Sequence, residues 1–214
     1  MEKREYIIFQ DRVGAGVLLA EELSKYEGKK NVVVLGIPRG GVFVAKVVSD
    51  KLKVPLDVVV TKKIGAPYQE ELAIGAVGPE GSLVLDSKLI NDLGVDEEYI
   101  ENKAKEKSDE IVERLIKFRK AEKIKLYDKT IILVDDGIAT GATVEVAIKY
   151  LRKKKVGKIV LAVPVAPKES LVRFRKVVDE MLVLQTPFSF RAVGQFYRDF
   201  PQITDKEVIE LLKK

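Results

Sequence analysis

The sequence predicts an α/β protein with a doubly wound, mostly parallel sheet flanked by helices. Short, unbroken apolar runs recur along the chain, as in strands that are buried on both faces of a parallel sheet. Segments with apolar residues at helical spacing separate these runs. The alternation of strand and helix repeats four times, which is the pattern of parallel β-α-β units.

The first half of the chain supplies the first units and a hairpin. The first helix is expected to stop at Gly28, because glycine is common just after a helix. The turn from Pro38 to Gly41 separates the first strand from the helix after it. In chain order we expect a helix over 12–27, a strand over 31–37, a helix around 44–52, a strand over 56–61 and a hairpin of 72–77 with 82–86 around 78–81.

The second half continues the alternation after a long charged segment. Residues 96–120 carry a narrow apolar stripe, which predicts a surface helix packed along one seam. Thr204 and Glu207 form a capping box that opens a short final helix. Between them we expect a strand over 130–135, a helix over 141–154, a strand over 158–164, a helix over 167–176 and a strand over 178–184.

The domain organisation expected is one domain over 1–214, with a core over about 17–184. Residues 1–16 and 185–214 lie outside the alternation and are expected to fold together as a small hood. The start of the chain has no apolar signal-peptide core, and no apolar run approaches the length of a membrane span. We therefore expect a cytoplasmic protein without a membrane partner.

Two missing residue types restrict the chemistry. The chain has no Cys and no His. Thiol nucleophiles, thiolate metal sites, Ser-His-Asp triads and imidazole catalysis are therefore excluded. The 38 Lys and Arg against 33 Asp and Glu give a net charge of +5, which suits an anionic ligand but is too dispersed to indicate nucleic-acid binding.

The most informative segment runs from Ile131 to Thr143. A buried strand delivers Asp135 and Asp136 to its C-terminal edge, and a loop of small and hydroxyl residues then leads into a helix. The N–H groups of residues 139–143 are expected to form a phosphate cradle at that helix N-terminus, with the hydroxyls of Thr140 and Thr143. The two carboxylates would repel a phosphate, so their partner should be sugar hydroxyls or a cation.

Other phosphate motifs do not fit. A Walker loop needs Gly-Lys-Ser/Thr at its end, and none follows Gly137. A dinucleotide fingerprint needs a third glycine after Gly14 and Gly16, but Leu19 holds that place.

The 131–143 segment resembles the phosphoribosyl pyrophosphate (PRPP) signature of the type I phosphoribosyltransferases. That signature is four apolar residues, two acids and Gly-x-x-Thr-Gly-x-Thr, and the match is complete. The resemblance implies the type I phosphoribosyltransferase fold and catalytic roles for Asp135 and Asp136. It also implies a 5′-phosphate site made by Gly137, Ile138, Ala139, Thr140, Gly141, Ala142 and Thr143.

Two further matches concern pyrophosphate. Members of the family bind it with a short loop after the first core strand, and Arg39, Gly40 and Gly41 stand there. The family also closes a mobile loop over the site, for which residues 62–80 with Lys62 and Lys63 are the candidate. The alternative for this segment is a surface hairpin with solvated lysines.

A last match concerns the base. An aromatic segment over 187–200 resembles, loosely, the base-stacking segment of the hypoxanthine-guanine enzymes, with Phe188 and Phe190 as candidates. The alternative is a small aromatic core. With its Phe9-Gln10-Asp11-Arg12 start, its Pro38–Gly41 loop and its long helix over 96–120, the chain looks like a subgroup of phosphoribosyltransferases without a settled acceptor. The long helix departs from the compact purine-salvage pattern.

The resemblance implies a magnesium-dependent transfer of the 5-phosphoribosyl group of PRPP to a nitrogenous base, such as a purine, in nucleotide metabolism. Mg²⁺ would be held through the substrate and by Asp135 and Asp136. PRPP and a small-molecule base are the expected partners, nucleic acid is not, and a homodimer would fit the family. The alternative is a regulatory protein of the same fold that senses PRPP or nucleotides without turnover. Two further rivals are a nucleic-acid adaptor using the basic run 152–155 and a metal hydrolase using the acid pair.

Overall fold

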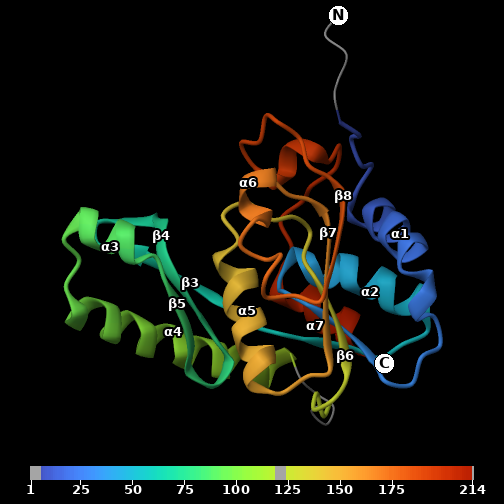
Figure 1. The fold of residues 1–214 in the computed structure, drawn as a ribbon, viewed down its shortest axis with the longest axis horizontal. Helices are drawn as coiled ribbons and strands as arrows, with labels where there is room; N and C mark the ends of the chain where they lie inside the picture. Colours follow the sequence, from blue (N-terminus) through green and yellow to red (C-terminus); the bar gives the residue numbers. More distant parts are fainter. Residues whose placement is uncertain (1–5, 119–123, 214) are drawn as a thin grey trace, which may run out of the picture.

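A computed structural model describes residues 6–118 and 124–213 and shows a central sheet from which a second unit projects as an arm (Figure 1). The central sheet has five strands in the order β2-β1-β6-β7-β8. Every pairing in it is parallel, which confirms the predicted fold class. Its strands are β1 (Val32–Gly36), β2 (Leu56–Val58), β6 (Thr130–Val134), β7 (Lys158–Val165) and β8 (Glu180–Gln185).

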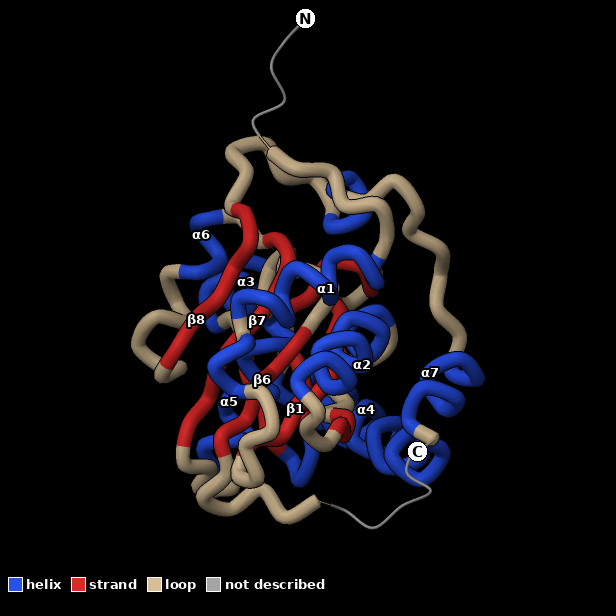
Figure 2. The backbone as a smooth tube through the Cα atoms, turned by 90° about the vertical axis from the view of Figure 1, so that its right-hand side faces the viewer, coloured by secondary structure: helices blue, strands red, loops and turns tan. Residues whose placement is uncertain are grey.

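Helices cover both faces of the central sheet (Figure 2). Successive side chains of a strand point to opposite faces, so Val34 and Ile132 pack toward α1 and α2, whereas Val33 and Leu133 pack toward α5. The strands are apolar throughout because neither face meets water. The body helices are α1 (Arg12–Glu22), α2 (Gly40–Leu52), α5 (Ala142–Lys153), α6 (Lys168–Leu171) and α7 (Asp205–Leu212).

The order of the strands places a topological switch point between β1 and β6. The chain leaves β1 toward β2 on one side and leaves β6 toward β7 and β8 on the other. The two strands run in register, with Gly36 opposite Val134, and the N–H of Ile37 donates to the carbonyl of Val134 at 2.9 Å. The loops after β1 and β6 therefore start side by side, where ligands bind in doubly wound sheets.

The arm is a three-stranded antiparallel sheet with two helices, drawn in green tones in Figure 1. Its elements are β3 (Lys62–Ala66), β4 (Gln69–Gly78), β5 (Ser82–Leu85), α3 (Ser87–Leu93) and α4 (Glu97–Phe118). The β4–β5 hairpin confirms the expected hairpin, and α4 confirms the long helix. The apolar stripe of α4, including Ile111, packs on Ile64 and Ile74 of the arm sheet.

The segment over 62–80 is not an irregular loop but has the secondary structure of the hairpin alternative, because most of it forms β3 and β4. Small residues interrupt the pattern of both strands, at Gly65 in β3 and at Ala73 and Gly75 in β4. Gly65 and Gly75 approach neighbouring backbone so closely that a Cβ would lie 2.4 Å from the carbonyl of Glu70 and 2.5 Å from that of Val84. Glycine at these positions indicates close strand contact rather than a loop.

Two helices are shorter than expected. α1 ends at Glu22, and a 3₁₀ turn over Ser24–Tyr26 continues it. The helix expected over 167–176 is only the four residues of α6. After α6, hydrogen bonds join residues three apart, as from the N–H of Phe174 to the carbonyl of Leu171. Phe174 is fully buried there, so packing of its ring favours tight turns over a continuous helix. Two further 3₁₀ turns are Pro79–Gly81 and Val193–Phe196.

The segment before α1 meets the segment after β8, beside β7 and β8. The N–H of Phe9 donates to the carbonyl of Phe196 at 2.8 Å, and its carbonyl accepts from Arg198 at 2.9 Å. We call residues 188–201 the hood segment. The final helix α7 opens with the predicted capping box of Thr204 and Glu207, but it packs against α2 and α4, away from the hood segment. Within the described residues no helix is both long and apolar enough to cross a bilayer.

Candidate active site

The acid pair lies directly after β6, against the loop that follows β1. The N–H of Asp136 donates to Oδ1 of Asp135 at 2.9 Å. A Cβ at Gly40 would lie 1.8 Å from Oδ2 of Asp136, and one at Gly41 would lie 2.7 Å from Oδ1 of Asp135. The structure thus brings together the two loops that the sequence singled out. Both glycines are required there because any side chain would occupy the space of a carboxylate.

Burial dominates the electrostatics of the pair. It raises the pKa of Asp135 well above the ordinary value, and the neighbouring Asp136 charge raises it further. Burial also raises the pKa of Asp136, although the Arg12 guanidinium opposes that shift. Two adjacent buried carboxylates with raised pKa values are typical of a functional site, because packing alone does not require them.

Arg12 is one of the site residues to which the sequence analysis assigned no role. It is 7% exposed, and its Nε donates to Oδ2 of Asp136 at 2.8 Å. A signal was present in the sequence, because Arg12 shares the buried face of α1 with Ala15 and Leu19 at helical spacing. An arginine on a buried helix face needs a buried acid as its partner, although the partner lies 124 residues away.

The hood segment also reaches the acid pair. The hydroxyl of Tyr197 donates to the carbonyl of Asp136 at 2.6 Å. Burial raises the pKa of Tyr197, and the nearby charge of Asp136 adds to this effect. The tyrosine therefore remains a protonated donor, and the hood segment is fixed to the loop after β6.

The loop before α5 presents free backbone donors. Gly141 caps the helix with φ of 84°, and no side chain caps it. None of the hydrogen bonds of the described residues uses the N–H groups of 139–143, so these donors are available to an anion. The N–H of Ile138, in contrast, donates to the carbonyl of Val165 at 2.9 Å. The free donors thus begin at Ala139.

Two predicted loop residues serve packing. Ile138 is buried in the core, and a Cβ at Gly137 would lie 2.6 Å from Val193 of the hood segment. At Gly141 a side chain would meet the ring of Phe174 at 2.7 Å, besides the positive φ. A substitution at Gly141 would therefore disturb packing as well as any bound phosphate.

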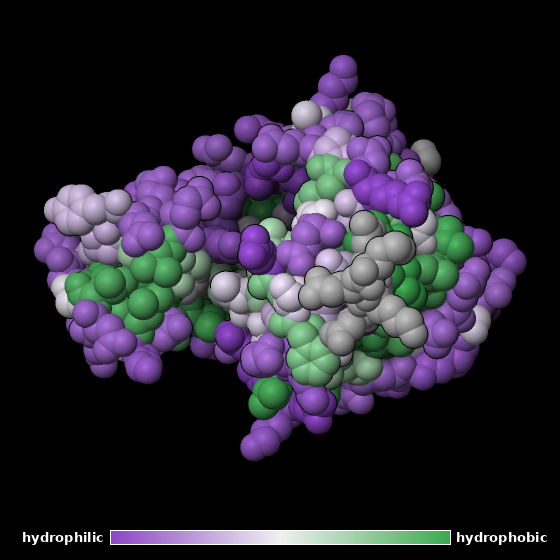
Figure 3. Space-filling view, turned by 90° about the horizontal axis from the view of Figure 1, so that it is seen from above, coloured by the Kyte–Doolittle hydropathy of each residue, from purple (hydrophilic) through white to green (hydrophobic). Residues whose placement is uncertain are grey.

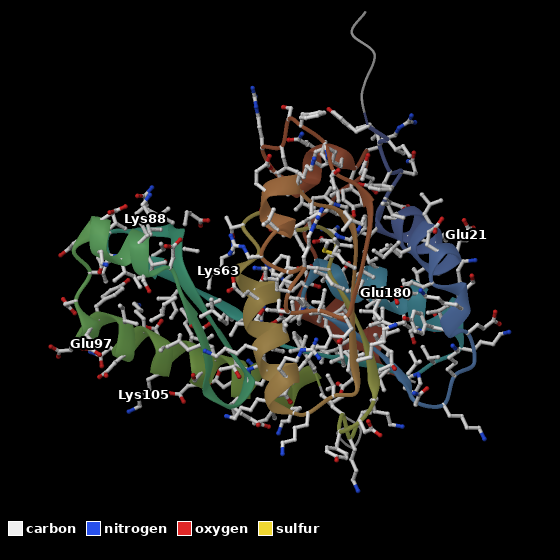
Figure 4. All side chains as sticks on the ribbon, viewed as in Figure 1. Glu21, Lys63, Lys88, Glu97, Lys105 and Glu180 are labelled. Atoms are coloured by element: carbon white, nitrogen blue, oxygen red, sulfur yellow. The ribbon has the colours of Figure 1, made fainter. Side chains whose placement is uncertain are left out.

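A cavity of about 620 Å³ lies between this loop and the arm. Figure 3 looks down on the molecule from the top of Figure 1 and shows a hollow there with a mostly hydrophilic border. Ala139 and Thr140 line the cavity from the body, and Lys63 lines it from the arm. Figure 4 shows Lys63 between the arm and α5. Arg173 also borders the cavity and pairs with Glu145 at 3.0 Å.

The two predicted lysines, Lys62 and Lys63, lie on opposite faces of β3. Lys62 is bonded to Glu110 of α4, on the opposite face of β3 from Lys63, because successive side chains of a strand alternate. Arg39 is exposed after a cis Pro38–Arg39 peptide bond, and within the described part of the chain no ion pair or hydrogen bond engages its guanidinium. Lys63 and Arg39 are thus two cations near these loops that have no ion pair among the described residues.

The two candidate phenylalanines also differ in environment. Phe188 is 96% exposed, whereas the ring centre of Phe190 lies 5.1 Å from that of Phe196, in the aromatic cluster that the hood segment forms with Tyr6 and Phe9. Phe188 is therefore free to meet a ligand, and Phe190 contributes to packing.

Comparison with known proteins agrees with this geometry. The family model described as "Phosphoribosyl transferase domain" matches residues 15–200, which include both loops of the site. The chain belongs to the phosphoribosyl transferase family. A protein found in two strains of Mycobacterium tuberculosis, CDC 1551 and H37Rv, whose name assigns it provisionally to the phosphoribosyl transferases, is 42% identical over 97% of this chain. This phosphoribosyl transferase domain spans 47% of the length of those relatives.

Solved structures agree on the fold. The crystal structure of TT1426 from Thermus thermophilus has a TM-score of 0.80 and 40% identity, covering 96% of this chain and 98% of that one. The AQ2163 protein from Aquifex aeolicus has a TM-score of 0.50 and 16% identity, with coverage of 81% and 73%. The second likeness concerns the fold alone.

The carboxylates of this phosphoribosyl transferase domain suit a metal ion that is held mainly by substrate and water. Among the described residues no three acidic, His or Cys side chains gather in a cluster that could hold a metal ion. Asp135 and Asp136 therefore supply at most two protein carboxylates. Mg²⁺ commonly takes one or two carboxylates with waters and substrate phosphate oxygens, so these residues fit magnesium that arrives with a phosphorylated substrate.

Proposed function

We propose that this domain transfers the 5-phosphoribosyl group of PRPP to a nitrogenous base and releases pyrophosphate. The observation that carries the proposal is the buried acid pair beside a loop of free backbone donors, at the switch point of a phosphoribosyl transferase fold. In the reaction the bond from the anomeric carbon to pyrophosphate breaks, and a bond from that carbon to a base nitrogen forms. The nitrogen loses its proton to solvent.

Each part of the site has a role in this proposal. The free N–H groups of residues 139–143, with the hydroxyls of Thr140 and Thr143, bind the 5′-phosphate. The loop over 39–41 and Lys63 bind pyrophosphate, and Arg39 supplies a guanidinium fork for its oxygens. Asp135 and Asp136 hold the ribose hydroxyls and stabilise the positive charge that develops on the sugar, as in glycoside cleavage. Magnesium held with the substrate near these two carboxylates would neutralise pyrophosphate charge.

The absence of His and Cys agrees with this chemistry. The reaction needs a neutralised leaving group and a fixed sugar, and it needs no nucleophilic side chain. Carboxylates, backbone amides and cations are sufficient for both tasks, and they are the groups that meet at this site.

The acceptor site is proposed to include Phe188. Its exposed ring offers a flat apolar surface on the same hood segment that contacts the acid pair, and stacking supplies roughly 1–3 kcal/mol per base. Phe188→Ala is expected to raise the KM of the acceptor by about tenfold and to leave PRPP affinity unchanged. Phe190→Ala, the matched control, should lower the melting temperature because it opens the aromatic cluster. Equal effects of both variants on acceptor KM would contradict this assignment.

The test of the function is pyrophosphate release from PRPP and Mg²⁺ with purine and pyrimidine bases supplied one at a time. Release that depends on one base supports the proposal and identifies the acceptor. PRPP binding without release for any base would identify a PRPP-sensing protein of the same fold. Failure to bind PRPP in a calorimetric titration would overturn the proposal.

A further inference from the structure

The guanidinium of Arg12 makes three directed contacts with two parts of the molecule. Its Nε donates to Oδ2 of Asp136 at 2.8 Å, and its Nη1 donates to the carbonyl of Pro201 at 2.9 Å. Its central carbon lies 3.8 Å from the centre of the Phe200 ring. The two hydrogen bonds and the stacking on the Phe200 ring together fix the orientation of the Arg12 guanidinium.

These contacts join the hood segment to the acid pair. Phe200 and Pro201 belong to the hood segment, and Tyr197 from the same segment packs on Phe200 with ring centres 4.9 Å apart. Tyr197 donates to the carbonyl of Asp136 at 2.6 Å, while Arg12 holds its carboxylate. Asp136 is thus held at its main chain and its side chain by groups that depend on the hood segment.

The arrangement fixes the orientation of the Asp136 carboxylate. Oδ2 faces Arg12 and Gly40, where a Cβ would lie only 1.8 Å away. The carboxylate therefore cannot rotate freely, and Arg12 fixes the direction in which its other oxygen, Oδ1, points. A carboxylate whose side chain is only 15% exposed also needs a counter-charge to stay ionised, and Arg12 supplies it.

We propose that Arg12 is a positioning residue that couples the hood segment to Asp136 and so controls how tightly the site holds the phosphoribosyl donor. This inference rests on the proposed function. Arg12 touches no substrate in this account. It orients Oδ1 and keeps Asp136 charged, and Phe200 and Pro201 keep Arg12 in place. A ligand that displaces the hood segment would therefore also change the donor site.

The experiment measures binding of PRPP with Mg²⁺ by calorimetry in the purified domain. Arg12→Met keeps much of the side-chain volume but removes the charge and both donors. We expect its PRPP affinity to fall by about tenfold or more, as for the loss of a group that orients a ligating carboxylate. Phe200→Leu keeps an apolar contact but removes the ring face, and we expect a smaller loss of about threefold.

The chain offers a matched control in Arg114. It pairs with Asp205 at 2.6 Å and lies 5.8 Å from the Phe118 ring, which reproduces the chemistry of Arg12 on α4, away from the acid pair. Arg114→Met should lower the melting temperature but leave PRPP affinity within about twofold, because distant sites act independently. A merely structural Arg12 would behave in the same way as Arg114.

Arg12→Lys keeps the proposal testable if Arg12→Met does not fold. Lysine retains the charge but cannot donate to Asp136 and Pro201 in one plane while stacking on Phe200, so we expect a folded protein whose PRPP binding is weaker by about threefold or more. Wild-type PRPP affinity in folded Arg12→Met, or in Arg12→Lys, would overturn the role of Arg12 and leave the proposed function standing. Absence of PRPP binding in the wild-type domain would overturn both.

Discussion

The carboxylates at the two ends of the central sheet have pKa values shifted in opposite directions. At the N-terminal end, Glu180 of β8 accepts hydrogen bonds from Lys158 at 2.8 Å and Tyr26 at 2.7 Å and pairs with Lys25 at 2.6 Å. Burial acts to raise its pKa, but these partners outweigh it and hold the pKa at about 2. At the C-terminal end, burial raises the pKa of Asp135 and Asp136.

The opposite pKa shifts distinguish Glu180, whose charge stabilises the fold, from the acid pair, for which we propose a function. The partners of Glu180 favour its ionised form, so its charge contributes to folding. The charges of Asp135 and Asp136 oppose folding, because only Arg12 pairs with them directly among the described residues. Carboxylates that are kept at a cost in stability indicate function. The same sheet thus uses one end for stability, and the proposed function assigns ligand binding to the other end.

The largest expected effect is a loss of turnover on substitution of the acid pair, at the C-terminal end of the central sheet. Asp135→Asn combined with Asp136→Asn should lower turnover in pyrophosphate release by about 10² or more, because the site loses its charge stabilisation of the sugar. The asparagine oxygens can still accept the hydrogen bonds of the carboxylates, so circular dichroism should show an intact fold. Near-wild-type turnover in the double variant would remove these residues from the catalytic machinery.

The two neighbouring lysines of β3 sharpen the comparison within the arm. Lys63→Ala should weaken PRPP binding by about tenfold, because Lys63 lines the cavity beside the phosphate loop. Lys62→Ala should leave PRPP affinity within about twofold, because Lys62 is bonded to Glu110 on the other face. Calorimetric titrations of the two variants decide this. A larger loss for Lys62 than for Lys63 would mean that the arm presents its other face to the ligand.

A smaller effect, on stability alone, is expected for Glu180 at the N-terminal end of the central sheet. The pKa of Glu180 is lowered in the folded state from 4.5 to about 2, so its contribution is complete above pH 4.5 and disappears as the pH falls toward 2. Glu180→Gln should lower the free energy of unfolding by about 1–2 kcal/mol at pH 7, with little difference from wild type near pH 2. Urea unfolding at several pH values measures this.

Glu106 provides the control for that experiment. Hydrogen bonds from Lys103 and Lys107 hold its pKa at about 2 as well, but this pair network is on the solvated surface of α4. Glu106→Gln should change stability less than Glu180→Gln, because solvent screens exposed charges. A difference for Glu180→Gln that grows as the pH falls would contradict the assigned direction of its pKa shift.

Local patterns predicted the central sheet and the two loops at its switch point. Apolar runs identify buried strands, and Asp135 through Thr143 forms one continuous motif. Both features can therefore be recognised from residues that are close together in the sequence. Gly40 and Gly41 were predicted as part of a pyrophosphate loop, and the structure adds a second reason for glycine there, because the carboxylates of Asp136 and Asp135 lie against them.

The roles of Arg12, of the two lysines and of the two phenylalanines depend on contacts between residues that are far apart in the sequence. Arg12 meets Asp136 from 124 residues away, and its meaning appears only when α1 is placed against the sheet. Lys62 and Lys63 were indistinguishable while their segment was expected to be a loop. Once the segment is a strand, alternation sends one to Glu110 and the other to the cavity. Phe188 and Phe190 likewise differ only through the aromatic cluster of the hood segment.

The single variant Asp135→Asn tests the contrast between the two ends of the central sheet most directly, with melting temperature and PRPP affinity measured on the same protein. Asp135 takes part in no ion pair among the described residues, so removing its charge relieves a cost of burial. We expect the melting temperature to rise by roughly 2–4 °C, while affinity for PRPP with Mg²⁺ falls by about tenfold or more. A fall in melting temperature together with wild-type affinity would show that Asp135 is a stabilising residue like Glu180, and it would contradict the account.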